Sequence, residues 1–586
     1  MAPITTGFEV PRRLRALVRA RESSLIGLAA VAGAMAGLAV AAMSAGVDLM
    51  HSIFFGLAPG ERLSAQDAIA PVLALMVPSL GGLALGIATA QVARRRPARE
   101  VDPIEANALR GGRMSLVGSL IVAAQTVWSS GVGASVGLEA GYTQLASALS
   151  SRLGRAFRLR RGDLRVLVGC GAAGGIAGAF AAPLAGSFYA FELVTGTYSV
   201  KSLAPVGTAA LIGYQVAHVS APLQLGILAG TAAPIRATDL VLSGILGLLA
   251  AAFGVALMRG VGSCEMLFMR LRVRSWLRPA IGGLIVGVLA LVSPQLMSSG
   301  HGALHLDSVL DHPLRQIAVL LALKALASTV SLGSGFRGGL FFASLLLGSL
   351  GGHLFAAGID LLWPSVAADP HAFAIIGMSA LAVSVIGGPL TMIFIALETT
   401  GDLWLTTAVL LAVIISGQVT RETFGYSFAT WRFHLRGETI RSAADVGWLR
   451  DLTVGRMMRH DVKTVPADMT IAAFREAAPL GSTSRAIAIE QDGRYAGIVI
   501  VPEAHAHELA ADVAVRAILH HTDNFLVPSM TVREAVIAFD RTEAEALAVV
   551  DSPISRRLVG LLTEAHTLRR YSEESELRRR ELLGEV

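Results

Sequence analysis

The sequence predicts a multi-span α-helical membrane protein whose two halves form an inverted repeat with broken helices, followed by a C-terminal α+β module of two tandem repeats. Of the 586 residues, 53% are hydrophobic and only 16% are charged, whereas about 25% of a typical soluble domain is charged. Long apolar runs fill residues 24–440, and shorter strand-like and helix-like segments follow at 450–571. A basic cytoplasmic segment, 1–23, and a charged tail, 572–586, complete the predicted organisation.

The apolar runs of the membrane part each approach the roughly 20 residues that a helix needs to cross the hydrocarbon core. Proline and glycine interrupt several of them, as at 182–186 and 387–390. Irregular backbone at membrane depth is tolerated where it is buried in protein or lines a water-filled path. These breaks therefore favour a transport protein over a receptor or a single-span anchor. The runs lie at about 25–50, 70–93, 114–128, 164–191, 203–217, 240–258, 280–298, 315–331, 338–358, 372–398 and 404–420.

Most of the formal charge of +6 comes from arginine, which flanks the apolar runs. By the positive-inside rule these flanks face the cytoplasm, so we expect a plasma (inner) membrane protein with both termini in the cytoplasm. Residues 11–21 suit either an amphipathic surface helix or a basic topogenic start. The first apolar run is too long for the core of a cleavable signal peptide. The arginine clusters are Arg12, Arg13, Arg15, Arg19 and Arg21; Arg94, Arg95, Arg96 and Arg99; and Arg270, Arg272, Arg274 and Arg278.

The membrane part contains an internal repeat. Residues 183–192 and 389–398 share Pro, Leu, Phe, Ala and Glu without a gap, at a constant offset of 206 residues. A second pair, 137–139 and 339–341, shares its Gly and Leu at the nearby offset of 202 residues, and Phe341 takes the place of Glu139. Duplicated halves with interrupted helices are typical of transporters whose site lies at the repeat interface, near the membrane midplane.

Two glycine-rich loops, 131–141 and 333–344, lie at corresponding places in the two halves. Such loops leave backbone N–H groups free at the helix N-termini that they feed, and the helix dipole adds positive potential there. We therefore expect an anion site at these loops. The alternative is that the glycines only allow close helix packing.

Glu139 is the single acid of the first glycine-rich loop. Its carboxylate can occupy the donors that would otherwise hold an anion, so ionised Glu139 would block the path and protonation or anion competition would release it. The alternative is a structural carboxylate satisfied by backbone donors. Ionisable residues inside the membrane are functional by default, which favours the gate. Glu192 and Glu398 each end a proline-led segment at symmetric positions, which predicts a shared structural role for them.

The C-terminal module repeats one β-α-β-β order twice, with the same helix entry at 465–470 and 527–531. A charged helical tail is expected at 569–581. The first repeat is predicted at 462–465, 470–477, 485–490 and 495–501, and the second at 525–527, 531–542, 546–551 and 558–563.

These motifs together resemble the CLC family of chloride channels and proton–chloride exchangers. The family's gate motif, Gly-Lys/Arg-Glu-Gly-Pro, is similar to residues 137–141, and its Gly-x-Phe-x-Pro motif is similar to 339–343. Its Asn-Ala-Pro-Leu-Ala-Gly and Ala-Pro-Leu-Thr-Gly segments resemble 181–186 and 388–392. The C-terminal tandem resembles the pair of CBS domains that many members carry.

The resemblance implies a homodimer with one anion pathway per subunit and Glu139 as the gating glutamate. Its expected partners are the lipid bilayer, inorganic anions and a second copy of the chain, and no nucleic acid. No cofactor is expected, and chloride is the substrate ion. The residues that the resemblance places at the anion are Gly137, Leu138, Gly339, Leu340, Phe341 and Ala429.

The chain departs from the family pattern at three places. The family's Gly-Ser-Gly-Ile-Pro loop aligns with 99–103, where its serine is missing. The family's central tyrosine falls on Ala429, although the nearby Tyr426 could substitute through a shift. The inner proton-relay glutamate falls on Leu193, which cannot carry a proton. These departures favour a passive or loosely coupled anion pathway, and a proton-coupled chloride or fluoride antiporter is the alternative.

Adenine nucleotides often bind CBS pairs through an Asp that follows the last strand. The corresponding turns carry His505 and His566 instead, and imidazole is a poorer acceptor for two ribose hydroxyls. We therefore expect weak or absent nucleotide binding and a tail that mainly supports the dimer.

Two other classes fit the sequence less well. A CBS-regulated divalent-cation transporter would need clustered acids, and the carboxylates here are isolated. An intramembrane enzyme would need a metal motif or a serine–base pair, and the chain is expected not to be an enzyme. His301 and His305 suit a solvated turn. Cys170 and Cys264 lie in apolar runs and are expected to pack as small residues.

Overall fold

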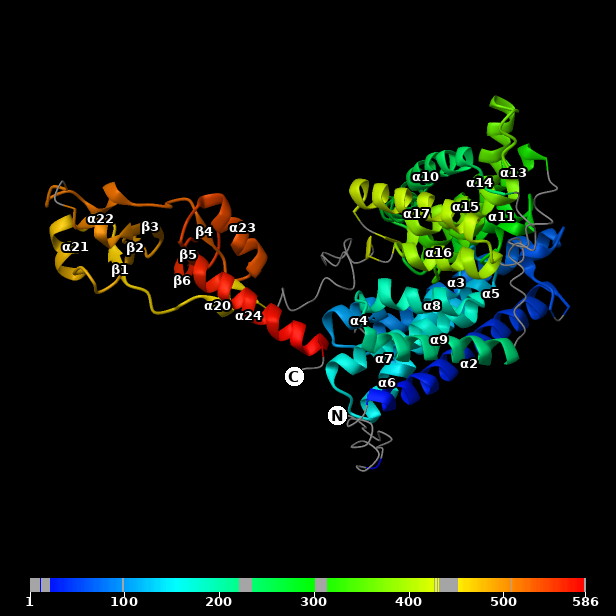
Figure 1. Cartoon of the computed structure of the whole chain (residues 1–586), viewed down its shortest axis with the longest axis horizontal. Coiled ribbons are helices and arrows are strands. Elements are labelled where there is room, and N and C mark those ends of the chain that lie inside the picture. Colours follow the sequence, from blue (N-terminus) through cyan, green and yellow to red (C-terminus); the bar gives the residue numbers. More distant parts are fainter. Residues whose placement is uncertain are drawn as a thin grey trace. The chain divides into compact units, whose positions relative to one another are not determined.

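The computed structural model separates into two compact units, Met1–Asp445 and Val446–Val586. Each unit has hydrophobic clusters of its own. Figure 1 shows the helices of the first unit and the small sheets of the second. The structure describes residues 11, 22–58, 60–96, 100–220, 234–300, 313–425, 427, 428, 430, 431, 452–506 and 509–583. Tyr426, Ala429, His301 and His305 lie outside this part of the chain, as does the predicted basic segment 1–23 except for residues 11, 22 and 23.

The first unit is built from helices. Seven of its described helices are long and apolar enough to cross a membrane, and four shorter apolar helices accompany them. The helices are α2 (Glu22–Phe55), α3 (Pro71–Arg95), α4 (Pro103–Leu109), α5 (Leu116–Gly131), α6 (Glu139–Ala156), α7 (Arg161–Phe180), α8 (Pro183–Tyr189), α9 (Val200–Ser220), α10 (Ala237–Arg270), α11 (Arg278–Ala290), α13 (Leu314–Ser334), α14 (Phe341–Leu362), α15 (Pro370–Ile386), α16 (Pro389–Thr400) and α17 (Leu403–Thr423), with short turns at Leu63–Ala65, Ala190–Thr195 and Pro294–Leu296.

The predicted duplication is visible in the packing. In the first half α6 packs on α7 and α2 packs on α9, and in the second half α14 packs on α15 and α10 on α17. Glycine permits the closest of these contacts, because a Cβ on Gly348 of α14 would overlap the carbonyl oxygen of Gly377 on α15. Close helix packing is thus one use of glycine in this unit.

The predicted helix breaks are confirmed in both halves. The apolar run 164–191 folds as α7 followed by α8, and the run 372–398 folds as α15 followed by α16. Each short helix starts with proline at its first turn, where the missing N–H costs no helical hydrogen bond. The preceding helices end in left-handed residues, Ala181 and Gly387, so the chain turns sharply and restarts.

Helix α6 was not among the predicted apolar runs, because serine and arginine interrupt its sequence. The serines are buried, and their hydroxyls donate to backbone carbonyls. The Oγ atoms of Ser147, Ser150 and Ser151 lie 3.1, 2.9 and 2.7 Å from the carbonyl oxygens of Val168, Ala146 and Gly112. A helix that satisfies its hydroxyls in this way is stable inside a membrane protein although its hydropathy is low.

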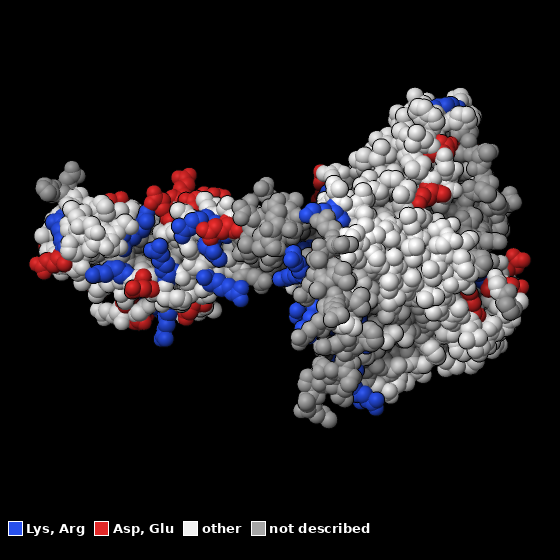
Figure 2. Space-filling view, turned by 60° about the horizontal axis from the view of Figure 1, so that its bottom comes forward, with Lys and Arg blue, Asp and Glu red and all other residues white. Residues whose placement is uncertain are grey.

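The outer surface of the first unit is largely uncharged in the view of Figure 2. Large apolar side chains are exposed along its helices, among them Leu49, Ile53, Leu80, Leu211 and Ile414. Apolar exposure on this scale suits contact with lipid rather than with water. The chain is a membrane protein.

The second unit contains the two predicted β-α-β-β repeats. Each has a parallel pair of strands followed by an antiparallel pair, in the sheet orders β1-β2-β3 and β4-β5-β6. The charged tail helix α24 (Glu564–Leu583) starts earlier than predicted, directly after the last strand. The elements are α20 (Val454–Met457), β1 (Thr464–Pro466), α21 (Ile471–Ala477), β2 (Arg485–Ile489), β3 (Tyr495–Ile500), α22 (Val501–Ala504), a turn at Val515–Ile518, β4 (Phe525–Leu526), α23 (Val532–Thr542), β5 (Ala546–Val550) and β6 (Leu558–Thr563).

Candidate functional site

Glu139 lies where the two halves of the membrane unit meet. It is the first residue of α6, and the loop before it pairs with the loop before α14. Gly137 N donates to Gly339 O at 2.9 Å, and Gly339 N donates to Gly137 O at 3.0 Å. This antiparallel bridge joins the positions that the repeat offset relates.

The bridge corrects one expectation. The N–H groups of Gly137 and Gly339 were expected to be free for an anion, but each is bonded to the other loop. Their backbone N–H groups therefore build the junction and are not free to bind an anion. The absence of their side chains has a separate function, because a Cβ on either glycine would overlap the Glu139 carboxylate.

The Glu139 carboxylate is buried, with 3% of the residue exposed. Its Oε1 accepts a hydrogen bond from Phe342 N, in the first turn of α14, at 2.8 Å. Its Oε2 has no hydrogen-bond partner among the described residues. The carboxylate of one half thus occupies a donor at the N-terminus of a helix in the other half, where the helix dipole favours negative charge.

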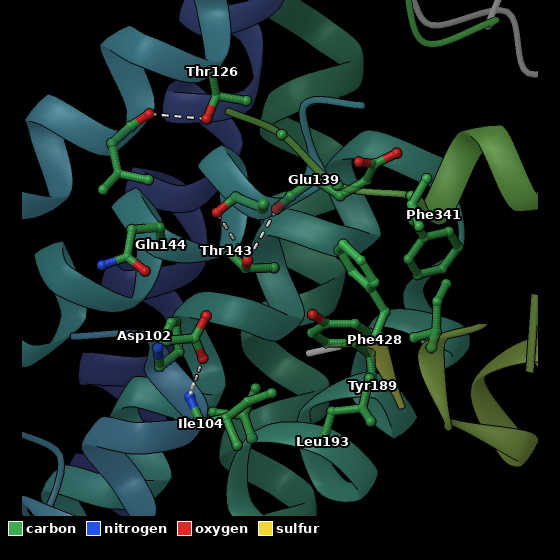
Figure 3. A pocket seen from close by; sticks show the side chains of 18 of the residues that line it. Asp102, Ile104, Thr126, Glu139, Thr143, Gln144, Tyr189, Leu193, Phe341 and Phe428 are labelled. Carbon is green, nitrogen blue, oxygen red and sulfur yellow. Dashed lines mark hydrogen bonds between the residues drawn. The ribbon is translucent and has the colours of Figure 1, made fainter. Parts of the chain in front are cut away.

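A cavity of about 180 Å³ adjoins this carboxylate. Figure 3 shows Glu139 on one side of it and Asp102 and Leu193 on the other. Its lining residues come from α4, α5, α6, α8, α14, α15, the turn after α8 and the loops before α4, before α14 and after α17. They are Glu100, Asp102, Pro103, Ile104, Val122, Thr126, Glu139, Ala140, Thr143, Gln144, Tyr189, Leu193, Val194, Arg337, Gly338, Gly339, Leu340, Phe341, Val385, Ile386 and Phe428.

The structure brings most of the predicted site residues to this cavity. Besides Glu139, the residues Gly339, Leu340, Phe341 and Leu193 line it. Leu138 is buried at the start of α6 and is not among the lining residues, and neither is Gly137.

Ala429 lies outside the described residues, so its predicted place at the anion stays a prediction. Its neighbour Phe428 lines the cavity.

Sequence reasoning missed several polar groups of the cavity. Among the described lining residues, Arg337 is the cation, and it lies close enough to Glu100 for charge attraction. Asp102 caps α4, with its Oδ1 accepting from Ile104 N at 2.8 Å. The hydroxyls of Thr143 and Tyr189 also face the cavity (Figure 3). The only feature of the sequence that pointed to Arg337 was its position in the second glycine-rich loop.

Glu192 and Glu398 hold the two halves together, in agreement with their predicted structural role. Glu192 accepts from Leu390 N at 2.8 Å and from Thr391 N at 2.9 Å, at the start of α16. Glu398 accepts from Leu184 N at 2.8 Å and from Ala185 N at 2.9 Å, at the start of α8. Each glutamate therefore caps the helix that corresponds, in the other half, to its own.

In the C-terminal unit, the side chains of the two histidines in the predicted nucleotide turns, His505 and His566, lie beside other groups of the same unit. Nε2 of His505 lies 2.9 Å from Ala478 O. Burial, together with the charges of Arg569 and Arg459, lowers the pKa of His566. His566 is therefore a neutral imidazole at pH 7.

The comparisons with known proteins agree with this architecture. A family model described as voltage gated chloride channel matches residues 81–421, more than half of the chain. The putative chloride channel protein ClcB-like of Ralstonia nicotianae is 31% identical over 432 residues, which cover 69% of this chain and 94% of that protein. The voltage-gated ClC-type chloride channel ClcB of Escherichia coli is 29% identical over 403 residues, covering 67% of this chain and 95% of that protein.

Solved structures share the fold. A slow cyanobacterial Cl⁻/H⁺ antiporter matches with a TM-score of 0.62 at 22% identity, covering 70% of this chain and 97% of its own. A eukaryotic CLC transporter matches with a TM-score of 0.59 at 18% identity and covers 94% of this chain and 98% of its own, so its match extends over the C-terminal unit. The matched family model, the bacterial relatives and these folds lead to one assignment: the chain belongs to the voltage-gated chloride channel family, also called the CLC family.

Proposed function

We propose that this protein moves chloride across a membrane through the cavity beside Glu139, and that Glu139 gates the passage. The observation that carries the proposal is the hydrogen bond from Phe342 N to the Glu139 carboxylate at 2.8 Å. The carboxylate is bonded to an N–H group at the start of a helix, next to a cavity between the two halves. Such N–H groups are the donors that bind anions. A side chain that stands in for an anion blocks an anion's path.

Protonation is the step that opens this gate in the proposal. A neutral carboxyl group is a weaker acceptor for Phe342 N and loses its attraction to the helix dipole. The side chain can then leave the donor, and chloride can take its place. Chloride can also compete with the ionised carboxylate for the same donor, so flux rises with both proton and chloride concentration.

Leu193 makes a passive or loosely coupled pathway the preferred mode. It lines the cavity on the side away from Glu139 (Figure 3) and cannot bind a proton. A proton-coupled chloride or fluoride antiporter is the second candidate, because Glu100 and Asp102 line the same cavity and carry carboxylates. Solved structures that share the fold include a Cl⁻/H⁺ antiporter and a CLC-type fluoride/proton antiporter.

Reconstituted liposomes test the function and separate its modes. The protein is placed in vesicles with a chloride gradient, and valinomycin with potassium sets the membrane potential. Chloride flux above that of protein-free vesicles supports anion transport, and its absence contradicts the proposal. A reversal potential at the chloride equilibrium value indicates a passive pathway, whereas chloride-driven uphill proton movement indicates the antiporter. Replacing chloride by fluoride compares the two anions.

We further propose a homodimer in the plasma (inner) membrane with both termini in the cytoplasm and no cofactor. The arginine-rich flanks support the orientation through the positive-inside rule. The exposed apolar side chains of the first unit provide surface for lipid and for a second copy. Cross-linking in native membranes and accessibility of introduced cysteines at residues 94 and 583 test the assembly and the orientation.

A further inference from the structure

An anion in this cavity needs hydrogen-bond donors, because an unpaired charge in a water-poor site is unstable. Gly137 and Gly339 bond to each other, and Phe342 N donates to Glu139. The two positions at which the family resemblance expects a hydroxyl are occupied by Glu100 and Ala429, and neither side chain can donate a hydrogen bond when Glu100 is ionised. Apart from the guanidinium of Arg337, the cavity must therefore supply a side-chain donor from another place.

Tyr189 has the required chemistry and position. It ends α8, and its phenolic oxygen points into the cavity towards Thr143 (Figure 3). Its ring lies 6.3 Å from that of Phe341, a residue at the start of α14. Glu398 caps α8 from the other half, through Leu184 N and Ala185 N. Tyr189 is thus carried by a short helix whose first turn is fixed by the other half.

The two hydroxyls differ in what they can donate. Thr143 Oγ1 already donates to Glu139 O at 2.9 Å, one turn back in α6, so it presents lone pairs to its surroundings. The Tyr189 hydroxyl faces Thr143, and a hydroxyl rotates freely enough to donate to an acceptor beside it. Tyr189 can therefore move its proton from the Thr143 oxygen to an anion in the cavity, which exchanges a neutral acceptor for a charged one, whereas Thr143 would have to give up its bond to the helix backbone.

We propose that Tyr189 is the side-chain ligand of the transported anion, and that it takes the place of the hydroxyls missing at Glu100 and Ala429. This inference rests on the proposed anion transport. In this view chloride sits between the Tyr189 hydroxyl and the start of α14, next to the position of the Glu139 carboxylate. The phenol then contributes to affinity and to the choice among anions, because its single donor favours one compact anion.

Tyr189→Phe tests the proposal, since it removes only the oxygen. A hydrogen bond to a charged group accounts for roughly a tenfold to hundredfold difference in affinity. Titration calorimetry of the purified full-length protein with sodium chloride should show chloride binding weakened by about that factor. Chloride flux in liposomes should also become less selective against larger anions such as nitrate.

Tyr142→Phe is the matched control. Tyr142 is buried in α6, and its hydroxyl lies 2.8 Å from Ser44 Oγ, outside the set of cavity-lining residues. The Tyr142→Phe variant should lose some stability and keep its chloride affinity and selectivity. If Tyr189→Phe folds and binds chloride as the unaltered protein does, the inference is wrong while the proposed function stands. If the unaltered protein neither binds nor moves chloride, the proposed function itself fails.

Discussion

At the scale of single residues, the cavity beside Glu139 is lined by charges of both signs. Its described lining residues include three carboxylates, on Glu100, Asp102 and Glu139, and one guanidinium, on Arg337. Two of the carboxylates accept bonds from helix-start N–H groups, which offsets part of their charge. In the proposed anion pathway, Arg337 would supply the positive charge that attracts an anion to the site.

Arg337→Gln should weaken chloride binding by about tenfold, because a unit charge several ångströms away in a partly buried site contributes on the order of 1–2 kcal/mol. Arg337→Lys keeps the charge and should keep most of the affinity. Calorimetry with chloride measures both variants. Arg421→Gln, at the exposed end of α17, is the control. Equal affinities for Arg337→Gln and Arg421→Gln would show that the Arg337 charge does not act on the anion.

Single residues were predictable from sequence only where their local setting was unusual. Glu139 stood out because an acid among small and apolar residues inside a membrane is costly without a function. Arg337 and Tyr189 did not stand out, because they come from different elements and only tertiary packing brings them to one cavity. For the same reason the mutual bonding of Gly137 and Gly339 could not be predicted, since each glycine alone suits a free donor.

At the scale of elements, the two halves depend on each other through exchanged helix caps. Glu192 caps α16 and Glu398 caps α8. The internal repeat made their shared role predictable, because the two glutamates occupy corresponding positions in the two halves and therefore have similar surroundings. The first glycine-rich loop predicted a helix start at Glu139, but the hydropathy pattern did not mark helix α6 as a membrane segment, because its serines are polar and only its packing satisfies them.

Glu398→Gln and Glu192→Gln should each reduce the free energy of unfolding by about 1–3 kcal/mol, the contribution of hydrogen bonds to a charged acceptor. The amide keeps one acceptor oxygen and loses the charge that favours the helix N-terminus. Thermal unfolding of the detergent-solubilised protein measures the effect, as a fall of about 2–4 °C per kcal/mol. Glu265→Gln, on the exposed face of α10, should leave the transition unchanged. A similar transition for all three variants would contradict the capping account.

Helix α13 holds the loop before α6 through one polar face. Lys324 is fully buried, and its Nζ donates to Gln295 O, Leu296 O and Ser298 O at 3.3, 3.1 and 3.0 Å. Ser298 N in turn donates to Gly133 O in the loop before α6. One and two turns along, at the spacing of one helix face, Ser328 Oγ and Ser331 Oγ bond to Ser135 of the same loop.

Lys324→Met should loosen this loop and let Glu139 leave its donor at neutral pH. Chloride flux in liposomes should then rise and depend less on pH. The double variant Lys324→Met with Glu139→Gln should behave as Glu139→Gln alone, because both changes act on one gate. An effect of Lys324→Met that is the same size in both backgrounds would mean that the lysine acts on transport by another route.

At the scale of the whole molecule, the chain combines a membrane unit with a second unit of two β-α-β-β repeats. Composition and the duplicated motifs made both predictable, because lipid-facing helices and alternating strands have different residue patterns. What the second unit binds could not be predicted with the same ease, since that depends on side chains at the ends of its strands.

The second unit should not bind adenine nucleotides. Nε2 of His505 is engaged by Ala478 O, and His566 is neutral at pH 7 because burial and nearby arginines lower its pKa. Neither imidazole can take the place of a carboxylate that holds two ribose hydroxyls. Calorimetry of the full-length protein with ATP should show no binding at micromolar concentrations, and chloride flux should not respond to ATP. Micromolar affinity would contradict this view of the unit.

Glu139→Gln in reconstituted liposomes tests the central claim most directly. Flux through the unaltered protein should rise as pH falls, because protonation releases the carboxyl group from Phe342 N. Glutamine is neutral at every pH and has nearly the same size, so the variant should pass chloride rapidly and without pH dependence. Chloride efflux measured from pH 4.5 to 7.5, with Glu265→Gln as the control, distinguishes the outcomes. A variant whose flux and pH dependence equal those of the unaltered protein would show that Glu139 is not the gate.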